Sequence, residues 1–204
     1  MLSNKFMIVA ILSSLIATLM SAISLISINK STQVLQDLSW GHGYTSFAGF
    51  DTDVFVGVLQ IGVQESTNND DQHQNVKYTD SNCSADFCHK CHKEMPIVYG
   101  FLAGFCFFSL FSIFSGFARY RDDGNTPGHR STGIGTSLIA IGCGLVSLIY
   151  FASGCYKKVV DYFPSNYDWE YGASFCLLAA AVCLKVVDIL VNMLVSVAGV
   201  MGCC

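Results

Sequence analysis

Three cysteines and two histidines lie close together in one polar segment, in the pattern Cys83-x4-Cys88-His89-x-Cys91-His92. Thiolate and imidazole groups are good zinc ligands, and four of these five would close a tetrahedral site. Zinc sites usually draw their ligands from two separated knuckles, however, and this segment offers one. Outside the cell, thiols oxidise unless a metal protects them. We therefore predict disulfide bonds here, with a zinc site as the weaker alternative.

An odd number of cysteines leaves one thiol of this segment without a partner. Cys155, expected near the outer end of an apolar run, is the natural fourth cysteine. Two bridges among the four are expected, and the sequence leaves their connectivity open. Asn82-Cys83-Ser84 also matches the acceptor pattern for N-glycosylation, so Asn82 is a candidate glycosylation site unless a bridge at Cys83 prevents it.

Lys185 and Asp188 interrupt the last apolar run of the chain. Three positions separate them, so both lie on one face of a helix. Charges at membrane depth are costly and are candidates for function. The pair has three interpretations: a local ion pair near the cytoplasmic interface, a contact with another membrane protein, or part of an ion pathway. We predict an intramembrane polar contact, because no charged residue of the other apolar runs continues a relay.

Other chemistry is sparse in this sequence. Cys203 and Cys204 end it beside an apolar run, as candidates for S-acylation or as free thiols. No catalytic triad, phosphate-binding loop or paired-carboxylate arrangement is recognisable, so we predict a protein that is not an enzyme and needs no cofactor. A net charge of −4 gives no basic footprint for nucleic acid.

The elements that must position these residues are four long apolar runs, at 6–28, 96–118, 133–155 and 171–200. A helix needs roughly 20 apolar residues to cross about 30 Å of hydrocarbon, and each run is long enough. Only 13% of the residues are charged, against about 25% in an average soluble domain. The first run is longer than the apolar region of a secretory signal, so we predict that it is retained as a membrane helix.

The four runs and the polar segments between them are predicted to form a single four-span domain over residues 1–204. Basic residues near the predicted helix ends give no clear orientation. The cysteines of segment 29–95 favour an oxidising compartment, which places that segment outside the cell. The loop at 119–132 is then cytoplasmic, the loop at 156–170 is extracellular, and both termini of this plasma-membrane protein are cytoplasmic.

The large extracellular segment is predicted to form a small β-sheet. Residues 54–63 are dense in β-branched and aromatic side chains, and Val76 and Tyr78 alternate with polar neighbours as in a returning strand. Too few apolar residues remain for an independent core, so the sheet must pack on helix ends, disulfides or a partner. The predicted fold is an all-α membrane protein, an antiparallel four-helix bundle with a small sheet in its first loop.

Several motifs resemble the claudin superfamily, which includes the peripheral myelin protein 22 and calcium-channel γ-subunit branches. Residues 142–154, then Val160-Asp161-Tyr162-Phe163-Pro164, then 170–175 are similar to the third helix, the connector and the Gly-x-Ser-aromatic start of the last helix in that family. Trp40 and Gly57-Val58-Leu59 lie where the family has Trp and Gly-Leu-Trp. The chain departs from the family at Gln60, which replaces the second Trp, and in lacking the Cys that follows shortly after.

The resemblance implies a structural, adhesive or scaffolding role at the cell surface, through assembly with copies of the chain or with other membrane proteins in the lipid. An accessory subunit that regulates a channel or receptor is the alternative, and a small transporter is the third interpretation. Three observations would distinguish these interpretations. A structural protein should self-associate into arrays, and an accessory subunit should bind one large partner at fixed stoichiometry. A transporter should show a flux that needs Lys185 or Asp188.

Overall fold

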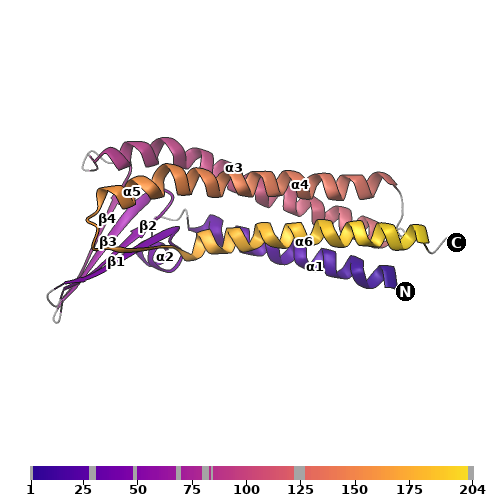
Figure 1. Ribbon diagram of the computed structural model, residues 1–204, viewed down its shortest axis with the longest axis horizontal. Helices are drawn as coiled ribbons and strands as arrows, with labels where there is room; N and C mark the ends of the chain where they lie inside the picture. The colour runs from indigo at the N-terminus through magenta and orange to yellow at the C-terminus, as the bar shows by residue number, and fades with distance from the viewer. Residues whose placement is uncertain are drawn as a thin grey trace. The chain divides into compact units, whose positions relative to one another are not determined.

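The computed structural model describes residues 2–27, 31–47, 50–67, 70–79, 83, 85–121 and 127–201. The chain divides into two compact units. The helical unit comprises Met1–Ala22, Phe101–Leu145 and Leu178–Cys204, and the sheet unit comprises Ile23–Gly100 and Val146–Leu177. Figure 1 labels the long helices α1 (Leu2–Ile26), α3 (Asp86–Arg121) and α6 (Ala173–Met201). Each of these helices contributes residues to both units.

Four stretches of helix among the described residues are long and apolar enough to cross a membrane, which confirms the four predicted spans at the level of length and composition. They are Met7–Ile26, Asp86–Ala118, Ser131–Tyr162 and Ala173–Leu194. The third stretch is not one regular helix. It runs through α4 (Pro127–Tyr150), a π-helical turn η1 (Phe151–Tyr156) and α5 (Lys157–Tyr162), so helix extends into the predicted 156–170 loop.

The second long helix also begins earlier than the sequence predicted. Helix α3 starts at Asp86 and contains Pro96, the residue at which the helix was expected to begin. The preceding residues suit a helix, and Lys90 and Glu94 form an i,i+4 ion pair of 2.7 Å between Nζ and Oε1. The polar segment is therefore shorter than predicted, and most of its cysteine–histidine cluster is helical.

A five-stranded antiparallel sheet has the order β4-β3-β2-β1-β5. Figure 1 labels its first four strands, β1 to β4. The strands of the predicted extracellular segment are β1 (Gly41–Phe47), β2 (Phe50–Val56), β3 (Gln60–Thr67) and β4 (Asp70–Lys77), and the later segment supplies β5 (Asp168–Tyr171). The small antiparallel sheet was predicted, but its fifth strand comes from outside the first loop. Strand β5 pairs with β1 from Gly41↔Tyr171 to Tyr44↔Asp168.

The predicted strand at 54–63 is in fact the end of β2, a turn, and the start of β3. The turn is closed by a hydrogen bond of 2.9 Å from the Gly57 amide to the Gln60 carbonyl. A side chain at Gly57 would collide with Leu35, because a Cβ there would lie 2.5 Å from Leu35 Cδ1. The buried Tyr78 hydroxyl donates to the Gly57 carbonyl at 3.1 Å, and burial raises the pKa of this phenol, which keeps it a donor.

Trp40 organises the core of the sheet unit. Its side chain is fully buried, and its indole Nε1 donates to Ser27 Oγ at 2.7 Å. Its backbone amide donates to the Val56 carbonyl, and its carbonyl accepts from the Gly172 amide at 2.9 Å. Phe151 packs against the indole with 5.2 Å between ring centroids. One residue thus joins the end of α1, the sheet, η1 and the start of α6, so the sheet packs on helix ends as predicted.

Two disulfides are present among the four candidate cysteines. Cys83 bonds to Cys88 five positions away, whereas Cys91 on α3 bonds to Cys155 on η1 across 64 positions. Cys91 and Cys155 are both completely buried. The long-range bridge therefore fixes two helices of the sheet unit together, and the short one ties Cys83 to the first turn of α3.

The two bridges should differ in their effect on stability, because a cross-link that closes a longer loop removes more entropy from the unfolded chain. Replacing Cys91 and Cys155 by serine is expected to lower the free energy of unfolding by about 4 kcal/mol, and the matched double change at Cys83 and Cys88 by about 2 kcal/mol. Denaturant titration in detergent micelles measures both. Equal losses, or a larger loss for the short bridge, would contradict the loop-length argument.

Candidate functional site

The face of α6 that packs inside the helical unit carries three polar side chains. Lys185, Asp188 and Asn192 follow one another at spacings of three and four residues, so they lie on one face of the helix. Their side chains are 0%, 2% and 7% exposed. Leu178, Ala181 and other apolar residues occupy the rest of this buried face. The polar groups therefore depend on partners from neighbouring helices.

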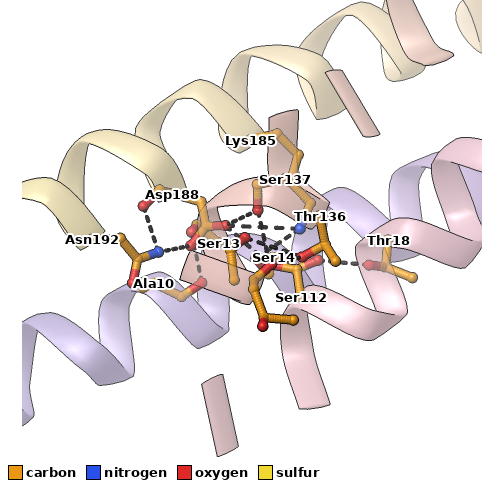
Figure 2. Close-up of polar contacts among 12 residues, drawn as sticks. Ala10, Ser13, Ser14, Thr18, Ser112, Thr136, Ser137, Lys185, Asp188 and Asn192 are labelled. Atoms are coloured by element: carbon orange, nitrogen blue, oxygen red, sulfur yellow. Dashed lines mark hydrogen bonds and ion pairs between the residues drawn. The ribbon is translucent and has the colours of Figure 1, made fainter. Parts of the chain in front are cut away.

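Lys185 points toward helix α1. Its Nζ donates a hydrogen bond of 2.9 Å to Ser14 Oγ, and it lies 3.9 Å from Asp188 Oδ2. Ser14 is buried in the middle of α1, and its carbonyl accepts from the Thr18 hydroxyl at 2.7 Å. The ammonium group is thus held between a hydroxyl of α1 and a carboxylate of its own helix (Figure 2).

Asp188 gathers donors from three helices. Ser137 of α4 and Ser112 of α3 donate to Asp188 Oδ2 at 2.8 and 3.3 Å. Asn192 Nδ2 donates to Asp188 Oδ1 at 3.0 Å and to the Asp188 carbonyl at 2.8 Å. Ser112 Oγ also lies 2.9 Å from Ser137 Oγ, so the single hydroxyl hydrogen of Ser112 is shared between Ser137 and the carboxylate. Both carboxylate oxygens are therefore satisfied, as buried charged groups require.

Small residues let the helices approach closely enough for these short hydroxyls to reach. A Cβ at Gly144 would lie 2.5 Å from Val182 Cγ2 and 2.9 Å from Phe105 Cδ2. At Gly116 it would lie 2.9 Å from Ile11 Cγ1. Close backbone approach at small residues is the usual way in which membrane helices pack. The polar cluster and the glycine contacts therefore belong to one packing arrangement.

The space beside the cluster is small. A cavity of about 10 Å³ is lined by Ser112, Asp188, Asn192 and apolar or glycine residues of the same unit. That volume holds about one water molecule. Chemically, the arrangement can stabilise a buried charge pair, but this cavity gives no room for a solute.

Sequence reasoning found only part of this cluster. It singled out Lys185 and Asp188 as an intramembrane polar contact, and the structure brings them together with partners from all three of the other long helices. It missed Asn192 and the serines. A signal existed for Asn192, which lies on the same helical face. Single serines in apolar runs are common, and the sequence does not tell where their side chains point.

The cysteine–histidine cluster does not form a metal site. Its cysteines are all in disulfides, so they have no thiolate to offer, and His89 and His92 lie exposed on α3. Among the residues that the structure describes, no three histidine, cysteine or acidic side chains are placed to hold a metal ion. The family-motif positions are structural neighbours: Trp40 and Gly57 are buried, and Leu59 is half-buried in the turn after β2. Asn82, Cys203 and Cys204 fall outside the described residues.

No protein-family model matches the chain, and no curated protein matches it significantly. The geometry of the chain itself therefore carries the functional argument.

Breaking the charge pair should destabilise the protein strongly. Asp188→Leu leaves the Lys185 ammonium without its counter-charge and removes the acceptor of two serine hydroxyls. We expect the free energy of unfolding to fall by about 3 kcal/mol, because a lone charge in an apolar helical segment costs that much. Unfolding of the purified protein in mixed detergent micelles measures the loss.

The matched control is Val187→Leu, on the exposed side of the same helical turn, which should change stability by less than about 0.5 kcal/mol. The double variant Lys185→Met, Asp188→Leu should recover part of the loss, because it removes both charges. A double variant that is less stable than Asp188→Leu alone would show that the ammonium does not need this carboxylate.

Proposed function

We propose that the chain is a claudin-like, non-enzymatic protein of the plasma membrane, with a structural, adhesive or scaffolding role exercised through assembly with copies of itself or with other membrane proteins. The observation that carries this proposal is the closure of the polar cluster within one chain. Every interaction described above for Lys185 and Asp188 is made to a residue of the same helical unit. A cluster that is closed in this way stabilises the fold of the helical unit, which supports a structural role.

Transport is disfavoured by the same geometry. An ion or proton pathway needs a series of polar groups and water-filled space leading to both membrane surfaces. Here the carboxylate accepts hydrogen bonds from fixed neighbours, and the adjoining cavity has room for about one water. The ionisable pair is occupied in holding helices together, which supports a structural role.

The surfaces of both units supply groups for assembly. Strands β4 and β5 are the two edges of the sheet, and edge strands expose backbone donors and acceptors to a partner. Helix α3 exposes an aromatic series that contacts lipid or another helix, with Phe107, Phe111 and Phe114 exposed by 56%, 47% and 69%. These features support a protein that works through its contacts.

The proposal also places the sheet outside the cell and both termini in the cytoplasm. Two disulfides in the sheet unit support an oxidising compartment for it. The described residues contain four candidate spans, and an even number of spans supports placing both ends of this sequence on the same side of the membrane.

Assembly and flux, measured on the same preparation, test the proposal. The protein is extracted in mild detergent, its particle mass is determined, and the same sample is reconstituted into vesicles for ion and proton flux. We expect masses that are multiples of this chain, and a flux equal to that of empty vesicles. Asp188→Asn, which keeps the shape of the side chain, and the control Val187→Leu should both leave the flux at that background level.

Two results would change the assignment. Recovery of one larger membrane protein at fixed stoichiometry would replace self-assembly by an accessory-subunit role. A flux that is present in the wild-type protein and the Val187→Leu control, but lost in Asp188→Asn without loss of assembly, would identify a transporter.

A further inference from the structure

A histidine on β1, the strand beside the edge strand β5, lies between two carboxylates from different strands. His42 is on β1; its Nε2 is 2.8 Å from Asp53 Oδ1 on β2, and its Nδ1 is 3.2 Å from Glu170 Oε1 on β5. The three side chains are 24%, 27% and 75% exposed, so solvent protons reach the site. Phe55 stacks on the imidazole at 5.0 Å between ring centroids and holds the plane of the ring.

This geometry satisfies both carboxylates only when the ring is protonated. A neutral imidazole has one N–H donor and one lone pair, whereas an imidazolium ion donates from both nitrogens. In the neutral state one carboxylate therefore faces a lone pair. Of the two, Glu170 makes the longer contact and is the more exposed, so its contact is the one that a neutral ring gives up.

The other charged groups around the ring are also acidic. A cavity of about 300 Å³ beside it is lined by His42, Tyr44, Asp168, Trp169 and Glu170. On the side of η1, Tyr156 covers the neighbouring Gly41. No lysine or arginine is among the described residues that line this cavity, so no fixed cation replaces the imidazolium when it loses its proton.

Strand β5, which this contact joins to β1, has the shortest backbone ladder among the described strands of the sheet. Strand β5 has four residues and pairs with β1 alone, over the four positions Asp168 to Tyr171. The Trp169 ring lies flat against Gly43, where a Cβ would come within 2.6 Å of it. The contact between His42 and Glu170 crosses this short ladder and adds to the ring contacts that Trp169 makes with Tyr156, Phe163 and Tyr167.

We propose that His42 is a proton-dependent latch for β5. In the protonated state the ring links β2, β1 and β5 in one line, and acidification tightens β5 on the sheet. Loss of the proton releases Glu170, and β5 with Trp169 moves more freely at higher pH. The surface formed by β1 and β5 thereby responds to the pH of its surroundings.

The two tryptophans of the chain provide a selective readout. Trp40 is fully buried, whereas Trp169 is partly exposed on β5, so acrylamide quenches mainly Trp169. Histidine ordinarily changes its charge between about pH 5 and pH 8, which sets the range for the experiment. In the full-length protein in detergent, we expect the quenching constant to rise at least about twofold from pH 5.5 to pH 8, the size expected for loss of a cross-strand ionic pair.

Three variants decide the outcome. His42→Gln cannot be protonated and should show the same quenching at both pH values; Glu170→Gln, which leaves the Asp53 contact intact, should reduce the pH response to less than half. The control His89→Gln removes an exposed histidine on α3 and should respond like the wild-type protein. Wild-type quenching that does not change with pH, or a pH response that survives in both His42→Gln and Glu170→Gln, would overturn the latch.

Discussion

The buried pair Lys185 and Asp188 is the constraint on which the helical unit depends. Charges taken out of water must find all their partners within the fold, because unpaired ones cost several kcal/mol each. Here the partners are hydroxyl groups on short side chains, so the helices that carry them must lie close. Glycine at 116 and 144 permits that approach. The charge pair thus adds directional contacts from α6 to α1, α3 and α4 to the apolar packing of the four helices.

The sheet unit is held together differently, because its strands have too little apolar surface for a core of their own. Trp40 supplies a centre by hydrogen bonding to Ser27, Val56 and Gly172 and by packing against Phe151. The Cys91–Cys155 bridge then fixes two helices beside it. Peripheral strand β5 depends on a short backbone ladder and on His42, which leaves it the most responsive part of the sheet.

The long helices could be predicted because apolar length is a local signal. The four bridged cysteines could be predicted as a set from redox chemistry, but their pairing could not, since Cys91 and Cys155 are 64 positions apart. Strand β1 could not be predicted in this way. Its start reads Gly41-His42-Gly43, which is typical of a loop; its ladders with β2 and β5 make it a strand, and the two glycines leave room for the rings of Tyr156 and Trp169. Ser112 and Ser137 were missed for a similar reason, since only the packing of three helices directs them at Asp188.

Amine labelling of the protein in lipid vesicles tests the closure of the polar cluster most directly. A small membrane-permeant acylating reagent reaches any lysine that is open to water or to lipid, and mass spectrometry of peptides reads each site. Lys157 and Lys158 are exposed and should be modified in the folded protein, whereas Lys185, with no exposed surface, should be modified only after unfolding in SDS. Modification of Lys185 in the folded protein at a rate similar to that of Lys157 would show that the cluster is open, and would contradict its role as a closed structural lock.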